Sequence, residues 1–555
     1  MTEQTQQSNS KFNPKNAKVI ALVAILVVVF IVGIVTVTVL ATRRGSQSFS
    51  KGFTVSISGR ECTITAYSGE DTTVRIPATI QGKKVTGIGE RAFVDAKNVE
   101  NIEFADGISV LDIAEGAFEG LTKLVYVQLP DADITIGKAA FRGCTQLSHM
   151  TMPAGVKEIG AEAFSGCTNL KYTGSEASDQ FVLPANLQSI GEKAFYKCMA
   201  LTDVKVNDAL SSVGESAFES SGLKYFRMGS GSKLTVLNDR VFYGANLLST
   251  ETTPFDFVNI TNIGNESFAG MRTSFTYISV PKTVKAIGNE AFCDCKSLNK
   301  VVFAADADPI WGTGTFQGCN SLESVELPTT ITKLTERMFA GCYRLLNKND
   351  FTIGKNVTTI EDGALSLYYK QTSESRTSYY NKRIVVDPEN TSFVVVNLAQ
   401  YQQKSSGSDT VVNKDHSILM TADKKELVAY FGGFDSNSEY SSQVSSKGVF
   451  RLLEGETKFW DDIEVIRAYA FAGVRAKSIF VPPHVNTIGA YAFAGSDIEI
   501  VYFEGPNCTL AEETFDDMQA GLLVTTRGGA QGSISEFVYR KAKQGMDIAF
   551  GNNTL

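Results

Sequence analysis

The apolar and polar positions of this chain follow one repeating pattern over most of its length. Each unit contains an Ile-Gly-x-x-Ala-Phe segment, as in residues 136–141, or a variant of it. The segment recurs at intervals of 22 to 26 residues, except for one interval of 31 and one of 106. An alternating stretch of the form Leu-x-x-Val-x-Leu-Pro follows, as in residues 124–130. Such alternation predicts a short strand with one face in a core, and the proline ends the strand because it lacks an N–H.

The last position of the Ile-Gly segment is the most regular feature of the sequence, and fourteen of the 35 phenylalanines occupy it. The positions of this register are Phe93, Phe118, Phe141, Phe164, Phe195, Phe218, Phe242, Phe268, Phe292, Phe316, Phe339, Leu365, Phe471, Phe493 and Phe515. Ala140 with Phe141 predicts a helical or 3-10 turn that packs the ring inside, after a tight corner that Gly137 permits. One unit cannot bury its apolar side alone, whereas stacked units can, so the sequence predicts a mainly β solenoid.

Cysteine and proline positions make the repeat specific. Examples are GCTQLSHMTMP ending at Pro153 and GCNSLESVELP ending at Pro328. Over roughly residues 61–520, these repeats resemble the BspA-like class of leucine-rich repeats. The resemblance implies a leucine-rich-repeat solenoid of the kind found on bacterial and some protozoan surface proteins, and a role in adhesion to extracellular-matrix and host proteins.

These patterns divide the chain into seven predicted parts. They are a short polar and basic segment (1–18), a transmembrane helix (19–41), a stalk (42–52), an N-terminal cap with leucine-rich repeats (53–365), an insertion (366–465), C-terminal repeats (466–520) and a C-terminal cap (521–555). The first cap is expected to be a hairpin that turns at Gly59. In the second cap, residues 522–526 read as a final strand, and Ser533 with Glu536 forms a capping-box pattern that predicts a short helix.

The insertion is rich in Ser, Tyr and Gln, with apolar runs at residues 393–396 and 418–430. It resembles the β-hairpin insertion that BspA-like proteins often carry between repeats, with longer loops. A distinct ligand-binding subdomain is the alternative interpretation.

Residues 19–41 contain no charge and are flanked by Lys15 and Lys18 on one side and by Arg43 and Arg44 on the other. At about 1.5 Å per residue, a helix of this length spans roughly 35 Å, enough for a bilayer core of about 30 Å. We therefore expect a single-pass membrane protein whose repeats are extracellular, because long C-terminal domains translocate largely regardless of flanking charge. A cleaved leader ending at Ala41 is the alternative.

Composition argues against several other classes of protein. Lys and Arg number 52 against 60 Asp and Glu, a net charge of −8 without a basic block, so a nucleic-acid partner is not expected. The three histidines are far apart in sequence, and we find no motif for a catalytic nucleophile, a phosphate loop or a zinc site. We therefore predict no catalytic residue, no metal and no cofactor.

Six cysteines lie three residues after the register phenylalanine: Cys144, Cys167, Cys198, Cys295, Cys319 and Cys342. Metal ligands must converge on a point, whereas these positions form a line along the stack. Small, buried, reduced thiols are the expected outcome. Adjacent rungs bring Cα atoms near bridging range, so Cys319 and Cys342 are the best candidates for a disulfide.

The outward positions of the predicted strands form the remaining candidate surface. Aromatic and arginine side chains are the types that make interface hot spots, and they recur here. The candidate ligand-binding residues are Tyr126, Tyr225, Arg227, Tyr277, Phe480 and Tyr502. The competing interpretation is a solvated sheet with incidental aromatic residues.

Three functional hypotheses follow. The first, which the family resemblance implies, is a membrane-anchored cell-surface binding protein that recognises an extracellular protein or a glycan in adhesion or host recognition. The second is a structural cell-envelope scaffold that displays residues 366–465. The third is a membrane-tethered enzyme with a site hidden in that insertion.

Overall fold

The chain divides into two units, Met1–Lys51 and Gly52–Leu555, and the elements below all belong to the second. The computed structural model describes residues 49–173, 181–272, 274–345, 351–367, 384–403, 409–431, 462–474, 478–496, 498–505, 507–518, 521–526 and 532–551. The predicted transmembrane helix at 19–41 lies outside these residues. Within them, no helix is both long and apolar enough to cross a bilayer.

Each rung of the solenoid contributes a strand at the Ile-Gly segment, here called a motif strand. In the first sheet, the motif strands are β5 (Lys83–Ile88), β7 (Val110–Ile113), β9 (Asp133–Ile136), β11 (Val156–Ile159), β14 (Ser189–Ile190) and β16 (Ser212–Val213). The same sheet also contains three strands that precede the first Ile-Gly segment, β1 (Phe53–Ser58), β2 (Glu61–Tyr67) and β4 (Thr79–Ile80). Further motif strands are β18 (Val236–Leu237), β19 (Asn262–Ile263), β21 (Ala286–Ile287), β23 (Ile310–Trp311), β25 (Lys333–Leu334), β27 (Thr359–Ile360), β32 (Val465–Ile466), β34 (Thr487–Ile488) and β36 (Thr509–Leu510).

Face strands are the second row, formed by the Leu-x-x-Val-x-Leu stretches, and they fall into five separate sheets. The first two sheets contain β3 (Thr73–Ile76), β6 (Asn101–Phe104), β8 (Tyr126–Gln128), β10 (His149–Thr151) and β12 (Tyr172–Thr173), then β13 (Phe181–Val182), β15 (Asp203–Lys205) and β17 (Tyr225–Arg227). The next two contain β20 (Tyr277–Val280), β22 (Lys300–Phe303) and β24 (Ser324–Glu326), then β26 (Phe351–Ile353) and β28 (Ile384–Val386). The last contains β33 (Ser478–Val481), β35 (Ile500–Phe503), β37 (Leu522–Thr526) and β38 (Ile548–Gly551).

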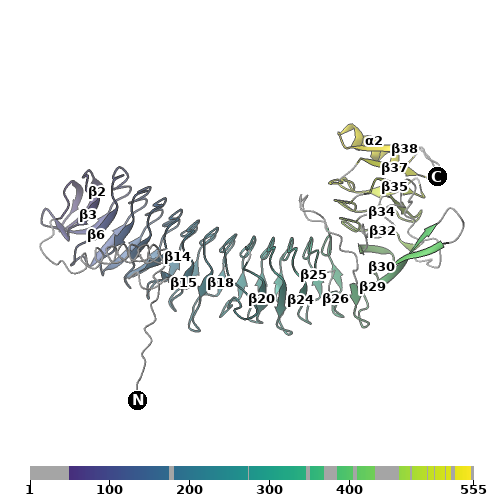
Figure 1. Cartoon of the computed structure of the whole chain (residues 1–555), viewed down its shortest axis with the longest axis horizontal. Helices are drawn as coiled ribbons and strands as arrows, with labels where there is room; N and C mark the ends of the chain where they lie inside the picture. Colours follow the sequence, from purple (N-terminus) through teal and green to yellow (C-terminus); the bar gives the residue numbers. More distant parts are fainter. Residues whose placement is uncertain are drawn as a thin grey trace, which may run out of the picture. The chain divides into compact units, whose positions relative to one another are not determined.

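Neighbouring strands of these rows are mostly parallel and follow one another in sequence order, as the colour gradient of Figure 1 shows. Parallel pairing in sequence order is the topology of a solenoid, in which each rung contacts only its neighbours. The mainly β solenoid predicted from the repeat is therefore confirmed.

The register phenylalanines form the centre of the core. All fourteen are buried, with an exposed fraction of at most 2%. From Phe93 to Phe339, the ring centres of consecutive rungs lie 4.8 to 6.0 Å apart, and most of the pairs are stacked. This separation is within the range that aromatic pairs prefer, so one ring per rung builds a continuous column.

The segment around each ring has the hydrogen bonding of the predicted 3-10 turn but does not continue as a helix. It is a series of hydrogen-bonded turns, in which Arg142 N–H donates to Ala139 and Cys144 N–H donates to Phe141. Ala139, two residues before Phe141, has a φ of 53°. This left-handed conformation stops a helix from continuing. The same conformation recurs at Arg91, Glu162, Lys193, Ser216, Arg240, Glu266, Glu290, Arg337, Tyr469 and Tyr491.

Gly137 has a different role from the predicted corner. Its φ is not in the positive range, and an added Cβ would lie 2.6 Å from the carbonyl oxygen of Ile113 on the preceding rung. At Gly160 a Cβ would lie 2.6 Å from the carbonyl carbon of Gly137. Glycine is therefore required here because consecutive backbones approach too closely for a side chain.

The cysteines form a second column beside the rings. All nine cysteines of the chain are free and buried, including Cys319 and Cys342. In six rungs the thiol donates to the carbonyl oxygen of the register phenylalanine of the preceding rung, at 3.0 to 3.2 Å. The pairs are Cys144 with Phe118, Cys167 with Phe141, Cys198 with Phe164, Cys295 with Phe268, Cys319 with Phe292, and Cys342 with Phe316. The predicted burial is confirmed, and the bond explains why a thiol recurs here.

The two caps agree with the sequence in part. The hairpin of β1 and β2 is antiparallel and turns at Gly59. At the other end, helix α2 (Ser533–Lys543) is present, but its N-cap residue is Gly532 and no side chain caps it. The predicted capping box is wrong, because the Ser533 hydroxyl bonds instead to the backbone of Cys508. Residues 522–526 form β37 but not the last strand, since β38 follows and pairs with it.

The predicted hairpin of the insertion is also present. Strands β29 (Phe393–Gln403) and β30 (Asp409–Thr421) are antiparallel, and β31 (Glu426–Phe431) pairs with β30. β31 then pairs in parallel with the motif strand β32. Because β28 also pairs with β26, both ends of the insertion continue the two rows of strands.

Candidate functional site

The structure places the six predicted ligand-binding residues on face strands, but in four different sheets. Tyr126 lies in β8, Tyr225 and Arg227 in β17, and Tyr277 in β20. Tyr502 lies in β35, in register with Phe480 of β33, whose side chain is outside the described part of the chain. The six residues therefore form several local groups rather than one continuous patch.

Tyr225 and Arg227 form the best-defined of these groups. Arg227 Nε donates to both carboxylate oxygens of Asp203, at 2.9 and 3.0 Å, and the guanidinium carbon lies 4.3 Å from the centre of the Tyr225 ring. Asp203 is brought there by the parallel register that pairs it with Tyr225. The hydrogen bond with Asp203 raises the pKa of Arg227, so this side chain is a fixed cation stacked on an aromatic ring.

Tyr126 belongs to a second group, with His149 of the next rung. The two rings are stacked with centres 4.5 Å apart, and their residues are register partners. Ser148 Oγ lies 3.0 Å from His149 Nδ1. Burial, followed by the nearby carboxylate of Glu103, raises the pKa of Tyr126. The half-buried pair presents aromatic surface whose rings hold each other in place.

Tyr277 is separated from Tyr225 by an irregular rung. Between β17 and β20, Ser249 and Phe275 form an isolated bridge, and the Ser249 hydroxyl bonds to the carbonyl oxygen of Tyr277. Tyr277 is in register with Lys300. Tyr225 and Arg227 therefore lie in a different sheet from Tyr277, because this rung interrupts the face.

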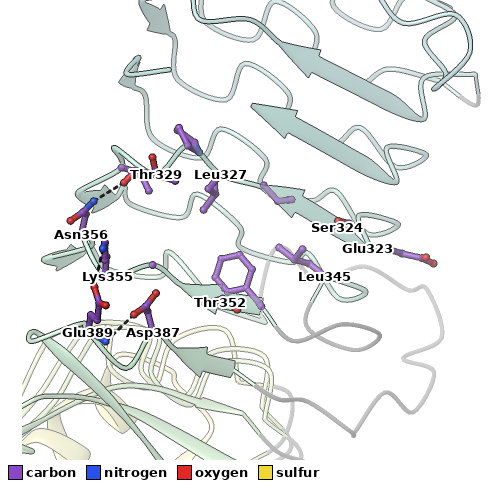
Figure 2. Close-up of a pocket in the computed structure, with 15 residues that line it drawn as sticks. Glu323, Ser324, Leu327, Thr329, Leu345, Thr352, Lys355, Asn356, Asp387 and Glu389 are labelled. Atoms are coloured by element: carbon purple, nitrogen blue, oxygen red, sulfur yellow. Dashed lines mark hydrogen bonds and ion pairs between the residues drawn. The ribbon is translucent and has the colours of Figure 1, made fainter. Parts of the chain in front are cut away.

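A groove of about 460 Å³ lies where β24 and β26 face each other, and its lining residues are drawn in Figure 2. Among the described residues, β24 pairs with β22 and β26 pairs with β28, but β24 and β26 do not pair. The same two rungs remain joined on the other side, where β25 pairs with β27. The rungs have therefore separated along the face strands only.

Two core positions are uncovered in this groove. Val325 and Leu327 are half-buried, whereas their equivalents one rung earlier, Val301 and Phe303, are 0% and 3% exposed. The sequence analysis missed the groove, although a signal exists. Phe351 follows Cys342 by nine residues, while Val325 follows Cys319 by six. The three additional residues displace the strand from its place in the ladder.

The structure shows little that would support chemistry. No group of three His, Cys, Asp or Glu side chains that could hold a metal occurs in the described ranges. Burial raises the pKa of the Cys144 and Cys508 thiols to about 12. A thiol with so high a pKa is a poor nucleophile at neutral pH, because the thiolate is the reactive form.

Comparison with known families identifies the repeat. The family model described as BspA type leucine rich repeat region, in six copies, matches residues 71–178, 171–299, 261–371 and 455–523. These ranges together cover more than half of the chain. A search of curated proteins found no match.

Solved structures of other proteins are similar to this chain at low sequence identity. A leucine rich cell surface protein from Faecalibacterium prausnitzii is 22% identical, with 58% of this chain and 86% of that one covered and a TM-score of 0.37. A leucine-rich repeat protein from Bacteroides ovatus is 23% identical, with 57% and 91% covered and a TM-score of 0.35. The pneumococcal vaccine antigen PcpA is 13% identical, with 93% and 100% covered and a TM-score of 0.34.

Proposed function

Because the chain belongs to the BspA-type leucine-rich-repeat family, we propose that it is a non-catalytic cell-surface protein that binds an extracellular partner through its face strands. In this proposal, residues 19–41 anchor it in the membrane by a single pass and the repeats lie outside the cell. The partner is an extracellular protein or a glycan, and the biological role is adhesion or recognition of a host or neighbouring cell.

The group formed by Tyr225, Arg227 and Asp203 is the observation that supports this proposal. An exposed arginine normally loses side-chain entropy when it enters an interface. Here the fork to Asp203 and the stacking on Tyr225 already hold it, although the Arg227 side chain is 48% exposed. Tyrosine and arginine fixed in this way are the residue types that dominate interface energies.

The test is binding of the purified chain to a panel of matrix proteins, host-cell proteins and glycans. For a ligand found in this way, Tyr225→Ala and Arg227→Ala should each weaken binding by about 1–2 kcal/mol. Lys205→Ala is a matched control, because Lys205 is an exposed neighbour of Arg227 in register. A ligand that binds both variants normally would show that the group is not the binding surface.

The position of the repeats can be tested separately on intact cells. Protease added outside should cleave the repeat region if it is extracellular, and complete protection would contradict the surface assignment. A variant that lacks residues 1–44 is the control, because without the proposed signal-anchor it should stay inside the cell and be protected from the protease.

A scaffold that displays the insertion is the second candidate. It is favoured by the length of β29 and β30, which span eleven and thirteen residues, whereas the face strands have two to five. Deletion of residues 397–417 should abolish binding in this case and leave the Tyr225 variants without effect.

A further inference from the structure

Among the residues that the structure describes, no strand lies in the groove between β24 and β26. Elsewhere in this sheet, β20, β22 and β24 pair edge to edge in parallel. At β24 the ladder stops, and it resumes with β26 and β28. Because β25 and β27 of the same two rungs remain paired, the solenoid itself continues and only the face strands are separated.

Both edges of the groove direct backbone hydrogen-bonding groups into it. Ser324 N–H donates to Asn299 on the preceding rung, so Ser324 faces β22. Asp387 N–H donates to the carbonyl oxygen of Ile353, so Ile353 faces β28. Alternate residues of a parallel strand face opposite neighbours. Val325 and Thr352 therefore direct their N–H and C=O groups toward each other across the groove, as an unpaired strand edge does.

The floor of the groove is apolar. Val325 and Leu327 are the half-buried core residues described above, and Phe351 is 5% exposed. A strand inserted between β24 and β26 would direct alternate side chains inward. Its inward residues would cover Val325 and Leu327 in the way that each regular rung covers the rung before it.

Charge defines the chemistry of the occupant. Three acidic residues line the groove, namely Glu323, Asp387 and Glu389, with Lys355 as the one basic residue among the lining residues that the structure describes. Lys355 pairs with Glu389 at 2.8 Å, and Glu323 pairs with Arg344 at 3.4 Å. Figure 2 shows Asp387, Glu389 and Lys355 at one end of the groove and Glu323 at the other. With Arg344 included, these three carboxylates and two cations carry a net charge of −1, which favours a basic segment over an acidic one.

We propose that this groove binds an extended, basic segment of another protein, which adds a parallel strand between β24 and β26. Strand addition of this kind takes its affinity from main-chain hydrogen bonds and its specificity from alternate side chains. The site is separate from the Tyr225 group, so the proposal does not depend on the function proposed for the face strands.

A peptide with the sequence SGLKYFRMG, that of residues 221–229, is a suitable probe. In the chain this segment contains the face strand β17, and its Lys224 occupies the repeat position that Glu323 occupies in the rung of β24. In parallel orientation, the lysine of the peptide would lie beside Glu323, where it would compete with Arg344, and its arginine would lie toward the end with Asp387 and Glu389. The control peptide, SGLEYFEMG, reverses both charges.

The experiment is fluorescence anisotropy of the labelled peptides with the full chain. We expect saturable binding of the basic peptide, at least tenfold weaker binding of the acidic peptide, and weakening by high salt. Thr352→Pro should weaken binding at least tenfold, because it removes an N–H that faces the groove and leaves the Ile353 bond to β28. Thr352→Ala is the matched control and should bind normally, since it retains the N–H.

Further variants separate this proposal from its alternatives. Asp387→Asn with Glu389→Gln should weaken the basic peptide several-fold, while Tyr225→Ala should leave it unchanged. Thermal unfolding of Thr352→Pro should resemble that of Thr352→Ala, which shows that lost binding is not lost folding. Equal binding by Thr352→Pro and Thr352→Ala would overturn the proposal. So would a wild-type dimer that Thr352→Pro dissociates, because the groove would then hold a second copy of the chain.

Discussion

Replacing Phe164 by alanine tests whether the aromatic column stabilises the solenoid. The ring is fully buried and stacks on Phe141 and Phe195, with centres 5.3 and 5.4 Å away and interplanar angles of 2° and 8°. Burial of a phenylalanine side chain is worth about 1.5–3 kcal/mol, and two aromatic pairs add about 0.5–1.5 kcal/mol each. Phe164→Ala should therefore lower the free energy of unfolding by about 3–5 kcal/mol, as ring deletions in cores do.

The assay for this prediction has to resolve single rungs. Solenoids unfold by nearest-neighbour steps, so a global two-state fit is not assured. We expect hydrogen exchange to accelerate at the backbone amides of the rungs that contain Phe141, Phe164 and Phe195, together with a lower midpoint of chemical unfolding. Ile310→Ala is the control, because Ile310 is 77% exposed and its loss should change stability by less than about 0.5 kcal/mol. A loss below 1 kcal/mol at Phe164 would refute the column as a source of stability.

Three further predictions concern the thiols and the turns. Cys167→Ala should cost about 1 kcal/mol in chemical unfolding, because it removes the bond to the Phe141 carbonyl; no measurable loss would show that this bond is unimportant. Burial raises the pKa of Cys144 from 9.0 to about 12, so the thermal midpoint should fall as pH rises from about 9 toward 12, where the unfolded thiol ionises first. Cys144→Ala should show a smaller fall, because the other buried thiols still ionise on unfolding; an equal fall in both proteins would contradict the argument. Ala139→Gly should be neutral or stabilising, because Ala139 has a φ of 53°, which glycine adopts without strain. Ala140→Gly should instead lower the free energy of unfolding by about 1 kcal/mol or more. Equal losses in the two variants would contradict this argument.

The sequence predicted those features that depend on the side chain at each repeat position. Phe141 and Cys144 recur at fixed places, and their burial follows from size and polarity alone. The N-terminal hairpin could also be predicted, because apolar and polar residues alternate on both sides of Gly59. Features that depend on how closely the backbones of neighbouring rungs approach each other could not be predicted in this way. Gly137 read as a corner, but the restriction comes from the Ile113 carbonyl on another rung, which no local pattern contains.

Capping was predicted incorrectly for a similar reason. Ser533 and Glu536 have the spacing of a capping box, yet the Ser533 hydroxyl bonds to Cys508, on the preceding turn of the chain. In a stacked fold, the backbone of the neighbouring rung competes with the local helix for each short polar side chain. Local motifs are therefore weaker evidence here than in a protein with fewer contacts between successive units.

The candidate site illustrates how register and chain length act together. Parallel register makes Asp203 the partner of Tyr225, and the pairing of Arg227 with Asp203 follows directly from it. That register holds only while each unit has the same number of residues between its cysteine and its strand. The three additional residues before Phe351 end it, so β24 keeps its partner on one side alone. The longer unit therefore interrupts the face between β24 and β26 and leaves a strand edge on each side of the break.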